Sequence, residues 1–180
     1  MIVLFQLSGS IACFKACSVV SALTQAGHDV RCAASRSALE FVGRATLEGL
    51  SANLVATDTF EEGRWMEHIE LPRQADLTIL CPATANRLNA MAAGSGADLL
   101  GTMFLAHDFT KPFLVAPAMN TRMWQHPVTQ RSVVSLRSMG LSFIEPEGGM
   151  LACGEVGAGR LAEPSTIVDE VLRVLGEQRS

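Results

Sequence analysis

The stretch IVLFQLSGSIACFKACSVVSALTQAGHDVRCAA, residues 2–34, decides the fold of this chain. An apolar run over residues 2–7 meets the short turn Ser8-Gly9-Ser10, and apolar residues then recur at helical spacing up to Gly27. A second apolar run follows over residues 28–34. This order of strand, tight turn, helix and strand predicts a βαβ unit with a right-handed crossover.

The same alternation continues along the rest of the chain. Further buried strands are predicted over residues 76–81, 111–116 and 141–144, with helical patterns between them. A last helix is predicted from Pro164, because proline suits the first turn of a helix. Strands that alternate with helices are typical of a parallel sheet covered on both faces. We therefore predict an α/β fold with a single domain, residues 1–180, in a three-layer α/β/α, Rossmann-like (flavodoxin-like) arrangement.

Composition narrows the classes of partner. The 180 residues are 48% hydrophobic, which is enough for one substantial core. A net charge of -4 without a cluster of Lys and Arg argues against nucleic acid and anionic membranes as partners. The longest apolar runs are strand-sized and no basic region precedes the first, so we expect a soluble, cytoplasmic protein. A small molecule is the expected ligand.

The five cysteines are an odd number and indicate a reducing compartment. Four of them lie in apolar periodic segments, where a small buried hydrophobe is the simplest interpretation. These four are Cys13, Cys17, Cys32 and Cys81. No CxxC pair or neighbouring histidine completes a metal site, so no metal is predicted.

The fifth cysteine, Cys153, lies in the segment EPEGGMLACGEVGAGRLAEP, residues 145–164. Five glycines surround it and the segment has neither helical nor strand periodicity, so we predict a loop. Its apolar residues argue against plain disorder, and loops of this length in compact domains are usually functional. We expect a flap that carries the thiol of Cys153 to a bound ligand.

Short hydroxyl and amide side chains follow four of the predicted strands. They lie in Ser8-Gly9-Ser10, Ser35-Arg36-Ser37, Pro82-Ala83-Thr84-Ala85-Asn86 and Pro117-Ala118-Met119-Asn120. Ligands of open parallel sheets bind beyond the carboxyl ends of the strands, and these residues suit a phosphate and a polar heterocycle. One glycine stands where a dinucleotide fingerprint has three, which disfavours NAD and FAD and leaves a mononucleotide. The alternative is that these serines and asparagines only cap helices.

Histidines offer a weaker signal. His68 precedes the predicted strand at 76–81 and could carry protons, although a lone histidine is more often a surface or capping residue. We interpret His28, His107 and His126 in that second way.

Five motifs together carry a resemblance that spans nearly the whole chain. They are GSIACFKA (9–16), MEHIEL (66–71), PATAN (82–86), PAMN (117–120) and LACGEVGAGRLAEP (151–164). In this order they resemble the flavin-dependent cysteine decarboxylases, in particular the members that act on phosphopantothenoylcysteine. The resemblance implies FMN-dependent decarboxylation of 4'-phosphopantothenoylcysteine to 4'-phosphopantetheine in coenzyme A biosynthesis. A peptidyl-cysteine decarboxylase, a flavin prenyltransferase-like enzyme and a non-catalytic regulatory flavoprotein remain alternatives.

The resemblance also implies roles for individual residues. The implied FMN-binding residues are Gly9, Ser10, Ile11, Ser35, Ser37, Ala83, Thr84, Ala85, Asn86 and Ala118. The implied catalytic residues are His68 and Cys153, with Cys153 as the acid that supplies the last proton. The implied substrate-binding residues are Asn120, Met150 and Ala152.

The chain departs from the family pattern at a few positions. Arg87 stands where a small hydroxyl residue usually follows PATAN, and Cys13 and Phe14 replace a commoner alanine and tyrosine. The resemblance further implies a homotrimer, or a trimer-based higher oligomer. Many bacterial members carry a fused ligase, and this chain ends too soon for one, so we expect a separate ligase to supply the substrate.

Overall fold

Five parallel strands form the central sheet, in the order β2-β1-β3-β4-β5. The strands are β1 (Ile2–Leu7), β2 (Asp29–Ala34), β3 (Leu77–Ala83), β4 (Phe113–Pro117) and β5 (Ser142–Phe143). They come from a computed structural model that describes residues 1–150 and 156–177. The predicted βαβ unit is confirmed, because β1 and β2 pair in parallel from Ile2 with Asp29 to Leu7 with Ala34.

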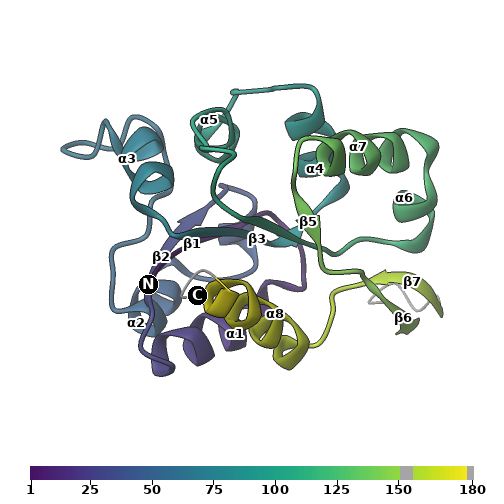
Figure 1. Ribbon diagram of the computed structural model, residues 1–180, viewed down its shortest axis with the longest axis horizontal. Helices are drawn as coiled ribbons and strands as arrows, with labels where there is room; N and C mark the ends of the chain where they lie inside the picture. Colours follow the sequence, from purple (N-terminus) through teal and green to yellow (C-terminus); the bar gives the residue numbers. More distant parts are fainter. Residues whose placement is uncertain (151–155, 178–180) are drawn as a thin grey trace.

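Helices cover both faces of the sheet, so the predicted three-layer architecture is also confirmed (Figure 1). One layer contains α1 (Cys13–Gln25), α2 (Arg44–Ser51) and α8 (Pro164–Glu177). The other contains α3 (Glu67–Gln74), α4 (Ala85–Ala92), α5 (Leu99–Leu105) and α7 (Pro127–Ser138). The 3-10 turn η1 (Ala38–Glu40) follows β2, and the short helix α6 (Thr121–Gln125) follows β4.

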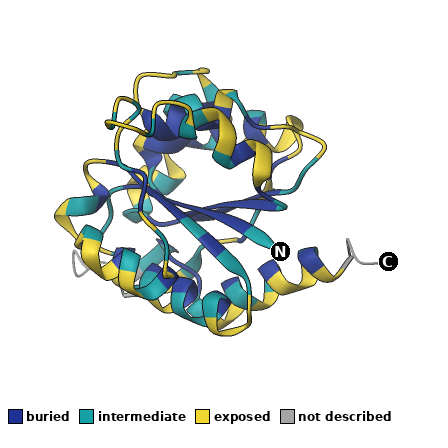
Figure 2. Cartoon of the chain, turned by 90° about the vertical axis from the view of Figure 1, so that its left-hand side faces the viewer, coloured by how far each residue is buried: buried dark blue, intermediate teal, exposed yellow. Residues whose placement is uncertain are grey.

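The strands are buried between the two helical layers, as Figure 2 shows. Alternate side chains of β1 point to opposite faces, so Val3, Phe5 and Leu7 join the core under α1 and α8. Leu4 points the other way and joins the core under α4 and α5. A parallel sheet that is apolar on both faces needs this double cover.

The segment 145–164 differs from the prediction. It contains an antiparallel hairpin of β6 (Glu147–Met150) and β7 (Val156–Arg160), in which Gly149 pairs with Gly157. The prediction of a loop without strands was wrong, because glycine has no side chain and cannot show the alternation that reveals a strand. Leu151 to Glu155, and with them Ala152 and Cys153, lie outside the described residues.

Two smaller features complete the fold. The predicted helix from Pro164 is confirmed as α8, whereas the predicted strand at 141–144 shortens to two residues. Within the described parts of the chain, no helix combines the length and apolar character needed to cross a bilayer.

Candidate functional site

The carboxyl ends of four neighbouring strands are joined by hydrogen bonds. Ser8, after β1, donates its hydroxyl to the carbonyl of Pro82 (2.7 Å) and accepts from the N–H of Thr84 (3.0 Å). The N–H of Ala118, after β4, donates to the carbonyl of Ala83 (3.0 Å). The N–H of Ser35, after β2, donates to the carbonyl of Leu7 (2.9 Å). The four sequence motifs therefore meet along one edge of the sheet, as predicted.

The turns after β1 and β2 lie in close contact. A Cβ added to Gly9 would lie 2.5 Å from the Oγ of Ser37 and 2.8 Å from its carbonyl oxygen, so only glycine fits there. The hydroxyls of Ser35 and Ser37 lie 3.1 Å apart, and Ser35 also accepts from the N–H of Ala38 (3.2 Å). Backbone contact thus brings both serines beside the turn that precedes α1.

The turn before α1 carries hydrogen-bond donors for an anion. Within residues 1–150 and 156–177, the N–H groups of Gly9, Ser10 and Ile11 have no hydrogen-bond acceptor. They precede the first turn of α1, where the helix dipole favours negative charge. The hydroxyl of Ser10 accepts from the N–H of Ala12 (3.2 Å), so this serine also stabilises the turn. We call Gly9, Ser10, Ile11, Ser35 and Ser37 the cradle.

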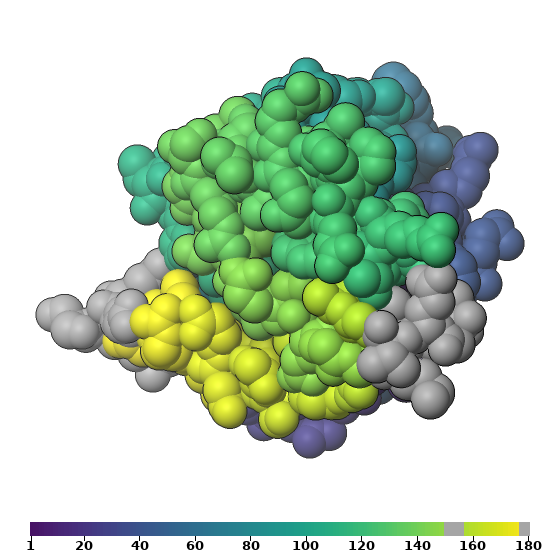
Figure 3. Space-filling model, turned by 90° about the vertical axis from the view of Figure 1, so that its right-hand side faces the viewer, coloured from purple at the N-terminus to yellow at the C-terminus, as the bar shows by residue number. Residues whose placement is uncertain are grey.

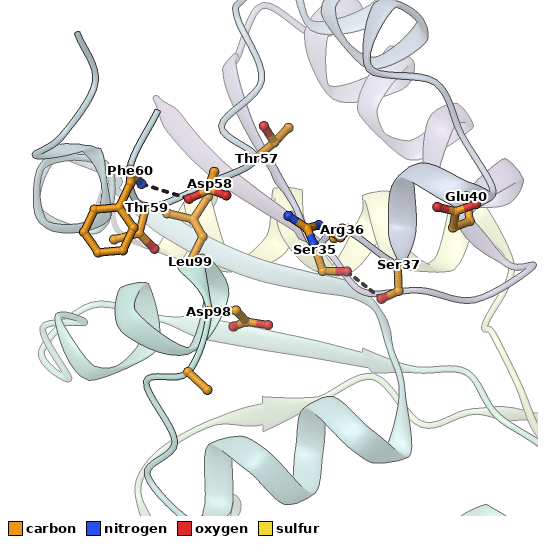
Figure 4. Close-up of a pocket in the computed structure, with 11 residues that line it drawn as sticks. Ser35, Arg36, Ser37, Glu40, Thr57, Asp58, Thr59, Phe60, Asp98 and Leu99 are labelled. Atoms are coloured by element: carbon orange, nitrogen blue, oxygen red, sulfur yellow. Dashed lines mark hydrogen bonds between the residues drawn. The ribbon is translucent and has the colours of Figure 1, made fainter. Parts of the chain in front are cut away.

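A cavity of about 700 Å³ opens beside the cradle. It is lined by Ser35, Arg36, Ser37, Glu40, Thr57, Asp58, Thr59, Phe60, Ala97, Asp98 and Leu99. Figure 4 shows Asp98 and Leu99 on a different wall from Ser35 and Ser37. This volume lies in the usual range for small-molecule and cofactor pockets. The cavity and the donors of the cradle together fit a phosphorylated cofactor such as FMN.

The two asparagines at strand ends have different structural roles. Thr84 caps α4 by accepting from the N–H of Arg87 (3.3 Å), whereas Asn86 is an exposed residue of the first turn. The capping alternative is therefore wrong for Asn86. Asn120 does cap α6, since its Oδ1 accepts from the N–H of Arg122 (2.8 Å). Capping uses the oxygen of the amide, so this role is compatible with donation to a ligand by the amide nitrogen.

The hairpin of the flap rests on the segment that contains Asn120. The N–H of Met119 donates to the carbonyl of Gly159 (2.8 Å). Gly159 has a φ of +121°, and an added Cβ would lie 2.5 Å from the carbonyl oxygen of Met119. A Cβ on Gly157 would lie 2.4 Å from the Oγ1 of Thr121. Figure 3 shows the yellow-green atoms of the hairpin against the green atoms of the α6 segment.

Charged residues anchor the carboxyl end of the flap to α1. Glu163 pairs with Lys15 of the first turn of α1 (3.0 Å) and with Arg160 of β7. The N–H of Glu163 donates to the carboxylate of Glu147 in β6 (3.1 Å). Burial and the nearby guanidinium of Arg160 lower the pKa of Lys15. The same helix therefore contacts both the cradle and the flap.

His68 lies apart from these residues. It is in α3, which packs on α5, while α6 and the hairpin are on the opposite side of the molecule (Figure 1). Among the described residues, its buried Nδ1 has no hydrogen-bond partner. One chain therefore does not bring His68 beside Asn120, which the sequence could not reveal.

The described cysteines behave as core residues. Burial raises the pKa of Cys13, Cys17 and Cys81, and it raises the pKa of Cys32 to about 12. All four are free thiols, and Cys17 is only half-buried. Protonated thiols are poor nucleophiles, so none of the four is a candidate for catalysis.

Some residues of the site and its surroundings were missed by sequence reasoning. Asp98 and the segment Thr57–Phe60 line the cavity, although neither follows a strand of the sheet directly. An Asp before a helical pattern could have identified Asp98 as the cap of α5, but not as part of a cavity wall. His107 was also misjudged, since it is buried against Phe109 and Phe113 rather than at the surface. His126 does cap α7, as expected.

Comparisons with known proteins agree with this architecture. The family model described as Flavoprotein matches residues 1–176. The coenzyme A biosynthesis bifunctional protein CoaBC of Bacillus subtilis (strain 168) is 44% identical over 180 residues, covering 99% of this chain and 44% of its own length. This chain thus spans less than half of that relative. A probable phosphopantothenoylcysteine decarboxylase of Streptococcus mutans is 37% identical over 171 residues, with 94% and 96% covered.

Two solved structures are also similar to this chain. One is a PPC decarboxylase mutant complexed with pantothenoylaminoethenethiol, with a TM-score of 0.86, 36% identity and 98% of each chain covered. The other is the FMN binding protein AtHal3, with a TM-score of 0.82, 35% identity, and 99% and 98% covered.

Proposed function

This chain belongs to the flavoprotein family, and we propose that it is an FMN-dependent phosphopantothenoylcysteine decarboxylase of coenzyme A biosynthesis. The substrate is 4'-phosphopantothenoylcysteine and the product is 4'-phosphopantetheine. The observation that carries this proposal is the seating of a glycine-rich hairpin on the segment of Asn120, beside a sheet edge with donors for a phosphate. Similarity to a PPC decarboxylase over 98% of both chains supports it.

The cradle would hold the phosphate of FMN. The N–H groups of Gly9, Ser10 and Ile11 and the hydroxyls of Ser35 and Ser37 are the donors. The residues Ala83, Thr84, Ala85, Asn86 and Ala118 would line the flavin ring. When bound, FMN supplies a two-electron acceptor that later returns the electrons.

The chemistry requires an electron sink on the substrate. A cysteine carboxylate loses CO2 only when the electrons left behind have an acceptor. Oxidation of the carbon that bears sulfur creates C=S, and the carboxylate is then β to this group. The chain's task is to hold the carboxylate, to move protons and to exclude water from the reactive thioaldehyde.

Individual residues divide this task. Asn120 would orient the carboxylate, and His68 would handle a proton in the oxidative half of the reaction. Cys153 would supply the last proton from the flap, residues 145–164, where Met150 and Ala152 would contact the substrate. We treat the flap as part of the single domain 1–180.

We further propose a homotrimer, or a trimer-based higher oligomer, in which neighbouring chains complete each site. The placement of α3 and α6 on opposite sides of one chain supports this, since in the proposed mechanism His68 and Asn120 would act on one substrate (Figure 1). Exposed apolar side chains surround His68 in sequence and would be buried by a neighbour. They are Phe60, Trp65, Met66 and Ile69.

A ligase activity in the cytoplasm would supply the substrate. The longer relatives named as bifunctional support a second activity that accompanies this one. Four free cysteines in the described chain support a reducing compartment.

Anaerobic turnover of the FMN-loaded chain tests the proposal. We expect CO2 release from 4'-phosphopantothenoylcysteine, and little from a peptide that ends in cysteine when the two compete. Absence of CO2 release from FMN-replete protein refutes the decarboxylase and favours a regulatory flavoprotein. Preference for the peptide favours a peptidyl-cysteine decarboxylase.

The variant Cys153→Ser tests the role of the thiol. We expect it to oxidise the substrate and release CO2 but to accumulate an unsaturated thiol product, because serine is a far weaker acid. Normal product from this variant would remove Cys153 from the proposed role.

A further inference from the structure

A partly buried ion pair contributes its carboxylate to the wall of the cavity. Arg87, in the first turn of α4, donates from its two terminal nitrogens to both carboxylate oxygens of Asp98, with one N–O distance of 2.9 Å. The side chain of Arg87 is 5% exposed, whereas that of Asp98 is 48% exposed. The guanidinium is therefore hidden and the carboxylate faces the cavity.

Asp98 is fixed in this position from both sides. Its Oδ1 also accepts from the N–H of Gly101 (2.9 Å), which makes Asp98 the cap of α5. Gly101 has no room for a side chain, because an added Cβ would lie 2.3 Å from the carbonyl oxygen of Ser95. Burial alone would raise the pKa of Asp98, but hydrogen bonds from Arg87 and Gly101 outweigh it and lower the pKa. The carboxylate is thus ionised at neutral pH.

The wall of the cavity carries more carboxylates than guanidinium groups, and this charge balance opposes the attraction of the cradle for a phosphate. In the described parts of the chain, three carboxylates line the cavity, those of Glu40, Asp58 and Asp98, against one guanidinium, that of Arg36. Ser35 and Ser37 of the cradle line the same cavity (Figure 4). Like charges in a partly desolvated site repel one another over several ångströms. A cation that neutralises part of this wall therefore favours the binding of an anionic ligand.

We propose that Arg87 is a positioning residue for phosphate binding, which neutralises Asp98 and so makes the cavity permissive for FMN. This inference rests on the proposed function, because it takes FMN as the ligand. Arg87 itself is buried behind Asp98 and acts through it. Among the described residues, the buried Nε of Arg87 has no hydrogen-bond partner. The side-chain hydrogen bonds of this guanidinium are therefore those to Asp98.

Comparison of FMN with riboflavin isolates the charge effect, because riboflavin lacks the phosphate. Both flavins are titrated into apoprotein, and the ratio of their affinities is the readout. We expect Arg87→Gln to weaken the binding of FMN on the order of fivefold and to change the affinity for riboflavin little. Only FMN carries a phosphate that the unpaired carboxylate of Asp98 would repel. High salt should reduce the difference.

Two further variants keep the test decisive even if Arg87→Gln does not fold. Asp98→Asn preserves the helix cap and removes the charge, so the FMN-to-riboflavin ratio should rise above the wild-type value. The double variant Arg87→Gln with Asp98→Asn should return the ratio toward wild type. Arg31→Gln is the matched control. Arg31 also pairs with an aspartate, Asp29, but this pair lies at the amino-terminal end of β2, away from the carboxyl ends of the strands where the cradle lies.

Several results would overturn the inference. They are an unchanged ratio in Asp98→Asn, an equal loss of both flavins in Arg87→Gln, and no recovery in the double variant. A wild-type chain that binds neither flavin would instead refute the proposed function, so the two failures are distinguishable.

Discussion

The cradle and the flap both depend on glycine, but glycine serves different ends in them. Gly9 lets two turns of the sheet edge touch, and those turns continue from buried parallel strands. Gly157 and Gly159 let a separate two-stranded hairpin seat on the segment of Asn120. The cradle thus continues directly from strands of the central sheet, whereas the hairpin of the flap is a separate two-stranded sheet. This difference suits a cofactor that stays bound and a substrate that must enter and leave.

The largest expected effect comes from breaking the cradle with Gly9→Ala. The new Cβ cannot fit against the backbone carbonyl of Ser37, so the two turns must separate. We expect FMN affinity to fall roughly 100-fold, equivalent to about 3 kcal/mol. Titration of apoprotein with FMN measures this.

The matched control for Gly9→Ala is Gly49→Ala in α2, where an added Cβ meets no atom within 4 Å. It should bind FMN as wild type does. Full FMN affinity in Gly9→Ala would show that contact between the two turns is not required for the cradle.

Breaking the flap's seat with Gly159→Ala comes next. Its positive φ and the nearby carbonyl of Met119 make any side chain strained, so the hairpin should shift away from Asn120. We expect kcat/KM to fall roughly 30-fold, or about 2 kcal/mol, with FMN affinity unchanged. Gly148→Ala, with no neighbour within 4 Å, should be nearly silent. A loss of FMN in Gly159→Ala would contradict the separation of the two regions.

A smaller effect is expected from Ser8→Ala, which tests the hydrogen bonds next to the cradle, between the ends of β1 and β3. The buried hydroxyl of Ser8 bridges the ends of β1 and β3, and its loss leaves the N–H of Thr84 without this acceptor. We expect the free energy of unfolding to fall by about 1.5 kcal/mol, measured by urea denaturation. Ser18→Ala, on the exposed face of α1, is the control. Equal stability in both variants would mean that the bridge contributes nothing.

The smallest expected effect is that of Lys15→Met at the base of the flap. The pair with Glu163 is only partly buried and is screened by solvent on the Glu163 side, so it contributes about 0.5 kcal/mol. We expect kcat/KM to fall roughly twofold at low salt, and the difference to vanish at high salt. Arg173→Gln, which removes an exposed pair with Glu170 on α8, should leave kcat/KM unchanged. A salt-independent loss in Lys15→Met would point to packing instead of charge.

The sequence predicts the sheet better than the flap for a physical reason. Runs such as residues 2–7 consist of apolar side chains that the fold buries. The spacing of these side chains and the length of the run therefore reveal the strand in the sequence. Gly148, Gly149 and Gly157 have no side chains, so no sequence pattern marks their strands. Their pairing depends on main-chain hydrogen bonds alone. The seat on Met119 likewise depends on a close contact between backbones, which no local pattern encodes.

The site divides in the same way. The positions of Ser35, Ala118 and the turn at Gly9 could be predicted. Each follows a predicted strand, and the carboxyl ends of parallel strands lie along one edge of the sheet. Asp98 reaches the cavity from the start of α5, and its pairing with Arg87 depends on how two helices pack. The separation of His68 from Asn120 also follows from three-dimensional packing and not from sequence spacing.

The most direct test of the central claim is CO2 release from carboxyl-labelled 4'-phosphopantothenoylcysteine by FMN-loaded wild type and Asn120→Asp. Aspartate preserves the cap on the N–H of Arg122 but presents a negative charge to the substrate carboxylate. We predict stoichiometric release by wild type and a rate roughly 100-fold lower in the variant, with unchanged FMN binding. Release by Asn120→Asp at the wild-type rate, or none by wild type, would contradict the account.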